Sequence, residues 1–398
     1  MGALDRGART ILYSRLTRPI SLPVKLQQFR ASGKQAQLVS KYRLYINQFA
    51  DLSQQESRTI KLAVKYLNKE GFEVFEGIGR YSAVGVLRNG PGKTVLLRAD
   101  MDALPIQEET DVPYASQTRM IDVVDGQAKS VMHACGHDMY TTSLIAAASC
   151  LSAARADWLG TLICLFQPDE EVDILFAQHV WPLHAGSVSV LLGPVFSTVD
   201  NFRVRVFSEG GYTSRPDCCV DPTVLTSHMI SVAVVTCGSI YGGSASNIIP
   251  GFVEFTLSVR SYKPDVCSRE LEPIRRVMKT ESEASGLPRE PEIERTDEAL
   301  PVINDHQLTS AREALSNTPS ALIEDFPYLA CDDIPYVYWT VGCIDHCTWD
   351  SAKSDNRLDT LPGLHSAKFL PSIDPTLQRG ADLLSIAALT FLDTDVKW

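Results

Sequence analysis

The chain of 398 residues is longer than a typical single domain, and its hydrophobic fraction of 44% is enough to build more than one core. Its net charge of -11 argues against a nucleic-acid partner, because binding to a phosphate backbone depends on clustered Lys and Arg. No apolar run is long enough for a membrane span, so we expect no membrane partner. The ten cysteines are scattered, which differs from the regular spacing of a small disulfide-bonded module and favours a reducing, cytoplasmic location.

Residues 1–37 differ in composition from the rest, and we expect them to form a disordered N-terminal extension. The first 36 residues hold seven basic residues against one acid. A basic, acid-poor start is also typical of a mitochondrial presequence, although Pro19 and Pro23 would interrupt a long amphipathic helix. A mitochondrial location therefore remains the alternative.

From about residue 38 the pattern alternates between helix and strand, which is typical of an α/β fold. Residues 56–70 have apolar side chains at helical spacing and predict a helix with one apolar face. Residues 83–87 and 94–99 are rich in β-forming residues, and the turn sequence at 89–92 between them predicts that they are neighbouring strands. Asp102 follows the second strand, at the end where α/β sheets gather their functional residues.

The stretch from Val131 to Asp138 carries a thiol, two imidazoles and a carboxylate directly before a predicted helix over 138–154. Cys135 and His137 are separated by a glycine, which permits a backbone bend that aims both side chains at one point. His133 is out of phase with this pair, and we interpret it as structural. The pattern predicts a metal site at the start of the helix.

Two further predicted strands end in groups that suit the same site. The strand over 161–166 is followed by Glu170 and Glu171, and a strand over 173–179 brings His179 to its end. Adjacent glutamates are ordinarily a solvated pair, but here they favour one metal ligand and one general base. Together with Cys135 and His137, these residues are the parts of a two-metal hydrolytic site.

Six strings, in order along the chain from about residue 40 to the C-terminus, resemble the metal-dependent amidohydrolases that include aminoacylases, hippurate hydrolases and auxin-conjugate hydrolases. The strings are those at 97–105, 132–138, 166–171, 179–180, 242–250 and 364–366.

The resemblance implies roles for individual residues. The ligands of two divalent metal ions (zinc, manganese or cobalt) would be Cys135, His137, Glu171, His179 and His365. Glu170 would be the general base and acid, and Asp102 would orient a ligating imidazole. The implied reaction is hydrolysis of the amide bond of an N-acyl amino acid or related conjugate by a metal-bound hydroxide.

The resemblance also implies an inserted α+β domain. The catalytic α/β sheet domain would comprise residues 38–188 and 302–398, and residues 189–301 would form a smaller lid and dimerisation domain, which implies a homodimer. Alternating strands at 202–207 and 253–260 fit such an insert. Substrate contacts in the insert are expected from Asn247, from Arg260 with a less certain match, and from Tyr212.

The sequence departs from the family pattern in several places. Tyr212 stands where relatives carry a lid histidine, an early histidine is absent near residues 47–52, and Ala367 replaces a usual proline. Residues 167–172 are too few for a helical crossover between parallel strands. Shortening is also indicated after Ile230 and before Glu324. An impaired or inactive descendant that binds metal or conjugate without turnover is therefore an alternative, and an aminopeptidase acting on short peptides is another.

The remaining Cys and His residues are weaker candidates. The segment 343–347 contains two cysteines and one histidine but lacks a second pair, so zinc binding there is not expected. Cys218 and Cys219 are interpreted as loop thiols, since vicinal disulfides are strained. His184 and His306 lack partners in sequence and are expected to lie on the surface.

Overall fold

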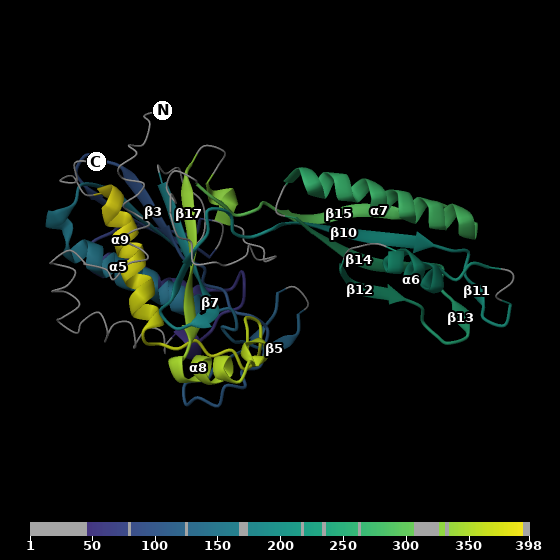
Figure 1. Cartoon of the computed structure of the whole chain (residues 1–398), viewed down its shortest axis with the longest axis horizontal. Coiled ribbons are helices and arrows are strands. Elements are labelled where there is room, and N and C mark those ends of the chain that lie inside the picture. The colour runs from purple at the N-terminus through teal and green to yellow at the C-terminus, as the bar shows by residue number, and fades with distance from the viewer. Residues whose placement is uncertain are drawn as a thin grey trace. The chain divides into compact units, whose positions relative to one another are not determined.

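The computed structural model describes residues 46–78, 81–123, 126–166, 174–215, 219–232, 236–261, 264–305, 326–330 and 334–392. The chain divides into two compact units (Figure 1). Unit 1 comprises Met1–Gly193, Asn304–Asn317 and Leu329–Trp398, and unit 2 comprises Pro194–Ile303 and Thr318–Tyr328. The expected N-terminal extension, residues 1–37, lies outside the described residues.

Unit 1 is built on a 7-stranded sheet in the order β1-β2-β6-β3-β7-β17-β8. Its strands are β1 (Glu73–Glu76), β2 (Ala83–Asn89), β3 (Thr94–Arg98), β6 (Gly160–Phe166), β7 (Ile174–His184), β8 (Val188–Val190) and β17 (Tyr336–Ile344). Strands β6, β3, β7 and β17 are parallel, and the outer pairings are antiparallel. The central strands are continuous apolar runs, which is typical of parallel strands buried on both faces.

Three helices supply apolar side chains to one face of this sheet: α4 (Ser57–Lys69), α5 (His137–Ala153) and α9 (Thr376–Leu392). Helices α5 and α9 pack against each other (Figure 1). Helix α8 (His346–Ser354) follows β17. The helices predicted at 56–70 and 138–154 are confirmed as α4 and α5. The apolar spacing of α4 matches its one buried face, whereas α5 is buried on all sides from Asp138 to Leu151.

The prediction that β2 and β3 are neighbouring strands is wrong, because β6 lies between them. The turn at 89–92 does reverse the chain, since β2 is antiparallel to β6 and β3 is parallel to it. The segment before β3 crosses the start of β6, where Thr161 N donates to Lys93 O at 2.9 Å. A turn signal is local, whereas this pairing depends on a strand about 70 residues further along.

The positions of the end of β6 and the start of β7 follow from the pairing of both strands with β3. β3 lies between these parallel strands, which are therefore about 10 Å apart. Arg98 pairs with Leu165 and Val95 with Ile174, so Phe166 and Ile174 are offset by a further ~13 Å along the strands. Phe166 and Ile174 are therefore about 16 Å apart. The shortened connection predicted at 167–172 lies outside the described residues, so it stays a prediction.

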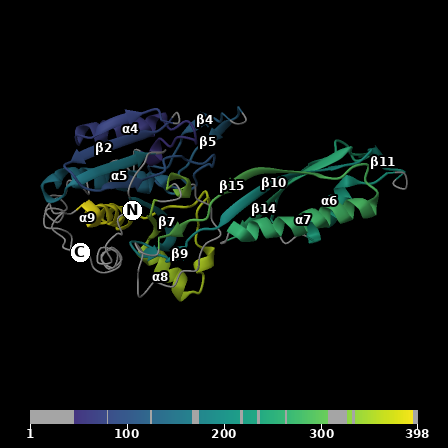
Figure 2. The ribbon, with the colours of Figure 1, turned by 90° about the horizontal axis from the view of Figure 1, so that it is seen from above.

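Unit 2 contains a 4-stranded antiparallel sheet in the order β12-β14-β10-β15. Its strands are β10 (Thr198–Phe207), β12 (Thr236–Gly242), β14 (Phe252–Ser261) and β15 (Glu292–Ala299), and its helices are α6 (Pro222–Val232) and α7 (Pro264–Ser285). One face of the sheet forms a core with both helices (Figure 2). On the other, Arg203 and Arg205 pair with Glu254. The alternating strands predicted at 202–207 and 253–260 are confirmed.

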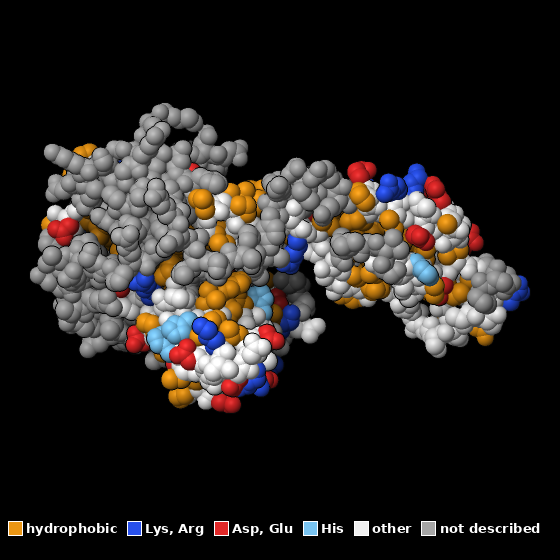
Figure 3. Space-filling model, viewed as in Figure 1, with side chains coloured by type: hydrophobic (Ala, Val, Ile, Leu, Met, Phe, Trp, Pro, Cys, Tyr) orange, Lys and Arg blue, Asp and Glu red, His pale blue; other side chains and the backbone are white. Residues whose placement is uncertain are grey.

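Three two-stranded ribbons complete the described structure. They are formed by β4 (Arg119–Ile121) with β5 (Ala128–Ser130), β9 (Gly193–Pro194) with β16 (Ile303–Asn304), and β11 (Gly211–Tyr212) with β13 (Ile248–Ile249). Acidic and basic side chains are interspersed on the visible surface (Figure 3). Among the described residues, none of the helices has the length and apolar character needed to traverse a bilayer.

Gly160→Ala should destabilise the fold more than Gly126→Ala. Both glycines have positive φ, 120° and 71°, so both variants carry backbone strain of about 1 kcal/mol. A Cβ at Gly160 would lie 2.4 Å from Lys93 O, while one at Gly126 would meet nothing within 4 Å. We expect Gly160→Ala to cost about 1–3 kcal/mol more in urea unfolding. Equal unfolding midpoints would contradict the close approach of Lys93 to β6.

Candidate metal centre

Three side chains of unit 1 converge beside the middle of β7, just beyond the carboxyl end of β3. The ligand atoms of Cys135, His137 and His179 all lie within 4.8 Å of one another. Cys135 lies in the loop before α5, His137 is the first residue of α5, and His179 lies on β7. The Sγ atom of Cys135 is 3.4 Å from Nε2 of His179. The structure therefore brings together three residues that are up to 44 positions apart in sequence.

Gly136 allows this convergence. It caps α5 with φ at 77°, in the left-handed region that disfavours residues with a side chain. A Cβ on Gly136 would lie 2.4 Å from Cγ2 of Val180, the neighbour of His179. The loop can bring Cys135 against β7 because this position has no side chain.

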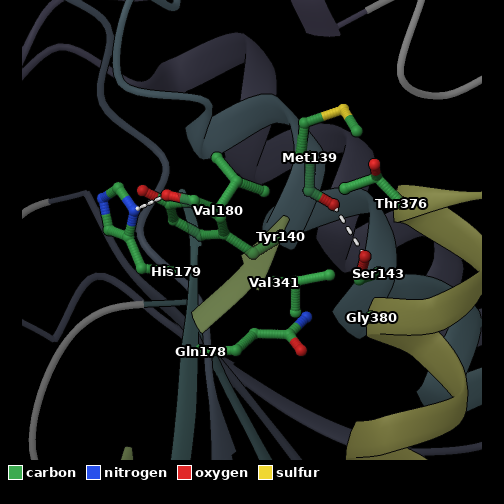
Figure 4. Close-up of a pocket in the computed structure, with 9 residues that line it drawn as sticks. All are labelled: Met139, Tyr140, Ser143, Gln178, His179, Val180, Val341, Thr376 and Gly380. Atoms are coloured by element: carbon green, nitrogen blue, oxygen red, sulfur yellow. Dashed lines mark hydrogen bonds between the residues drawn. The ribbon is translucent and has the colours of Figure 1, made fainter. Parts of the chain in front are cut away.

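Both imidazoles are oriented by a hydrogen bond from Nδ1. His137 Nδ1 lies 2.9 Å from Oδ1 of Asp102, and His179 Nδ1 lies 2.5 Å from the carbonyl oxygen of Val180 (Figure 4). With Nδ1 donating in each ring, Nε2 remains available on the side of Cys135. A carboxylate or carbonyl behind a ligating histidine is the usual arrangement in metal sites, because it fixes the tautomer and the ring orientation.

The charges of these groups stabilise one another. Burial alone would raise the pKa of the Cys135 thiol, but the positive charge of His179 and a hydrogen bond from His137 lower it to about 3. Burial also opposes ionisation of Asp102, but the charge and hydrogen bond of His137 lower its pKa to about 2. Burial lowers the pKa of His137, and Asp102 outweighs this effect and raises it well above its usual value. The protonated imidazoles therefore stabilise the Cys135 thiolate and the Asp102 carboxylate. A bound metal cation would supply positive charge in place of these protons.

His365 also reaches this cluster, although it lies in a loop far along the chain. Its backbone N–H donates to Ala134 O at 2.8 Å, which fastens the loop beside Cys135. A hydrogen bond to Cys135 raises the pKa of the His365 imidazole, against the effect of burial. His365 has φ at 65°, which is uncommon for a residue with a side chain. Four of the predicted site residues lie around the Cys135 sulfur. His137, His179 and His365 reach it directly, and Asp102 is linked to it through its hydrogen bond to His137.

The donor set fits a divalent cation. A thiolate and imidazoles with free Nε2 atoms are ligands that zinc prefers, and they also suit cobalt. Glu170 and Glu171 lie outside the described residues, so their predicted roles stay predictions.

Two sequence predictions near this site need correction. His179 does not end its strand, because β7 continues to His184 through pairing with β17. His184 is half-buried rather than on the surface, and its ring stacks on that of His346 with centroids 4.2 Å apart. His306 lies outside the described residues. The stack was missed because β7 and β17 pair in the sheet over a long sequence separation.

Segment 343–347 joins the end of β17 to the start of α8. Asp345 caps α8 by accepting from the backbone N–H groups of Cys347 and Thr348. Cys343 is buried and its thiol contacts the carbonyl oxygen of Trp181. Within the described part of the chain, Cys135, His137 and His179 form the one group with metal-ligand spacing. His133 is 2% exposed, and its interpretation as structural stays a prediction. Cys219 is a free thiol, and Cys218 lies outside the described residues.

Of the three predicted substrate residues, unit 2 brings two together. Tyr212 on β11 pairs in register with Ile248, and the next N–H, of Thr213, donates to Asn247 O at 3.4 Å. Tyr212 is 62% exposed. Arg260 lies at the opposite end of β14, a strand of 10 residues that spans about 30 Å. Arg260 therefore does not share a site with Tyr212 and Asn247 within this unit.

Sequence analysis missed Tyr140, which lies against both ligating imidazoles. Its ring centroid is 5.0 Å from that of His137 and 5.0 Å from that of His179. The available signal was its position one helical turn after His137, since residues three apart share a helix face. Figure 4 shows Tyr140 with Gln178 and Val180 of β7 and Gly380 of α9 around a small pocket.

Comparison with known proteins identifies the family. The model of Peptidase family M20/M25/M40 matches residues 96–358. The chain belongs to this family. It is therefore an enzyme that hydrolyses amide or peptide-like bonds, and family membership together with the donor set supports the use of divalent metal.

Similar curated proteins cover much of the chain. Thermostable carboxypeptidase 2 of Saccharolobus solfataricus is 28% identical over 87% of this chain and 93% of its own length. Hippurate hydrolase of Campylobacter jejuni is 33% identical over 62% of this chain and 70% of its own. Among solved structures, a dinuclear metal-binding M20 peptidase from Bacillus subtilis has a TM-score of 0.70 at 24% identity, covering 90% of this chain and 99% of that one. The last likeness concerns the fold.

Asp102→Asn should weaken divalent metal binding about 10–100-fold, because the amide cannot hold His137 as the carboxylate does. The affinity is measured by competition with a chromogenic chelator. Asp111→Asn makes the same chemical change at an exposed position and serves as the control. Equal affinities for the two variants would show that Asp102 does not orient the ligand.

Proposed function

We propose that this M20 enzyme hydrolyses the amide bond of N-acyl amino acids or related amino-acid conjugates at a centre of two divalent metal ions. The convergence of Cys135, His137 and His179 is the observation that carries the proposal. Relatives named N-acetyl-L-cysteine deacetylase and N-acyl-L-amino acid amidohydrolase support this substrate class. They are each 28% identical to this chain.

The proposed metal ligands are Cys135, His137, Glu171, His179 and His365. Bound divalent ions would polarise the substrate carbonyl and make a water molecule more acidic. Asp102 holds His137 in the tautomer that leaves Nε2 free, and the Val180 carbonyl does the same for His179. Glu170 takes the proton of the attacking water and delivers it to the leaving amine.

Substrate recognition is proposed for the ribbon that carries Tyr212 and Asn247. A phenol and a carboxamide both offer hydrogen-bond donors for a carbonyl or carboxylate. They lie side by side because β11 pairs with β13. Arg260 is retained as a separate candidate, since it lies at the other end of β14.

Glu170→Gln should abolish turnover and keep the metal, because the amide cannot accept the proton but is not a ligand. Glu171→Gln, its matched neighbour, should lose metal as well as activity. Amine release from a panel of N-acyl amino acids is paired with elemental analysis of each purified protein.

Undiminished turnover in Glu170→Gln would refute the assigned base. Metal without turnover in the unaltered chain would favour the inactive descendant. Turnover restricted to short peptides with a free amine would identify an aminopeptidase instead.

We also propose that unit 2 forms a homodimer through the free edge of β12. This strand carries no charged residue and exposes Ile240 and Tyr241, which are 49% and 65% accessible. The opposite edge strand, β15, carries four acidic residues, which would repel a second copy of the same edge. A twofold pairing of β12 strands would satisfy their backbone groups and cover the apolar side chains.

Ile240→Lys should convert the dimer into a monomer, because two lysines would face each other across the paired edge. Light scattering should give twice 43.8 kDa for the unaltered chain and 43.8 kDa for the variant. Asp297→Lys on β15 serves as the control and should remain dimeric. A monomeric unaltered chain, or a dimer that survives Ile240→Lys, would argue against this interface.

A further inference from the structure

Tyr140 lies beside both ligating imidazoles and contacts each of them. Its ring meets that of His137 at an interplanar angle of 43° and that of His179 at 45°, with both centroids at 5.0 Å. The two imidazoles are themselves nearly perpendicular, at 88°, with centroids 6.0 Å apart. One flat ring therefore bisects the angle between two ligands.

The position of this ring is fixed by its surroundings. Tyr140 is 1% exposed, so its ring has no room to move into solvent. It projects from α5 toward the strand that carries His179, as Figure 4 shows. His137 and Tyr140 belong to the same helix turn, which makes their separation a property of α5 alone. Tyr140 therefore contacts both the ligand on helix α5, His137, and the ligand on strand β7, His179.

We infer that Tyr140 is a positioning residue of the metal centre, whose ring fixes the relative orientation of His137 and His179. Each imidazole is held at Nδ1, by Asp102 or by the Val180 carbonyl, and directs Nε2 toward Cys135, but contacts at these two nitrogens do not prevent the ring from tilting about the line that joins them. A rigid plane packed on both rings blocks that tilt, and aromatic pairs of this geometry are favourable in their own right. The inference rests on the metal site proposed above.

A neighbouring aromatic residue provides the control. Trp181 contacts the His179 ring at 6.5 Å and 72°, and it is half-buried. Among the described ring contacts it meets His179 but not His137. Trp181→Leu removes an aromatic neighbour of His179 and leaves the contacts of Tyr140 with both ligands in place.

The test measures the dissociation constants of Zn²⁺ and Co²⁺ by chelator competition for the unaltered chain, Tyr140→Phe, Tyr140→Leu and Trp181→Leu. Tyr140→Phe keeps the ring and should bind within about twofold of the unaltered chain. Tyr140→Leu should bind about 10–100-fold more weakly, the loss typical when the support of a ligand is removed. Trp181→Leu should stay within about threefold. The visible spectrum of bound Co²⁺, which reports ligand geometry, should change in Tyr140→Leu alone.

Equal affinity and an unchanged spectrum in Tyr140→Leu would overturn the inference while leaving the metal site intact. An equal loss in Tyr140→Phe and Tyr140→Leu would also overturn it, because the hydroxyl and not the ring would then matter. If Tyr140→Leu does not fold, Tyr140→Met fills the space with a flexible side chain and takes its place. Failure of the unaltered chain to bind either ion would refute the metal site together with the role of Tyr140.

Discussion

The contact between the loop that precedes α5 and the middle of β7 is the constraint on which the site depends. It places the Cys135 sulfur 3.4 Å from Nε2 of His179, and it requires a residue without a side chain at position 136, where a Cβ would meet Val180. The parallel pairing of β7 with β3 and with β17 fixes the register of β7 in the sheet. The geometry of the site therefore follows from the register of a buried sheet.

Hydrogen bonding then orients the neighbouring imidazoles so that they can act as metal ligands. Asp102 and the Val180 carbonyl each accept from an Nδ1 atom, so that the opposite ring nitrogens are directed to the sulfur. The half-buried environment strengthens the attraction between the thiolate and its imidazoles, since charges are less screened there than in water. The backbone N–H of His365 donates to Ala134 O, which holds its loop beside Cys135, and its imidazole hydrogen-bonds the same sulfur. The imidazoles of the cluster would therefore release their protons when a metal cation binds.

Local patterns predicted the elements and their side chains better than their arrangement. Apolar spacing predicted α4 and β10, because each buries one face and the repeat of its apolar residues can be read from the local sequence. Helix α5 was also predicted, although it is buried on all sides from Asp138 to Leu151. The placement of β6 between β2 and β3, and the extension of β7 past His179 to His184, depend on pairing between distant strands. Residue chemistry indicated Cys135, His137 and His179, but Tyr140 has no ligating group and was recognised from its contacts alone.

The central claim is that these side chains bind a divalent cation in the folded protein. The most direct measurement is thermal unfolding of the unaltered chain and of Cys135→Ala, both prepared without metal. Unfolding is monitored by circular dichroism with and without added zinc or manganese. A ligand that binds only the folded state stabilises it by about 2.7 kcal/mol at one hundred times its dissociation constant. The account predicts that saturating metal raises the midpoint of the unaltered chain by several degrees and leaves that of Cys135→Ala unchanged. Identical midpoints for the unaltered chain with and without metal would contradict it.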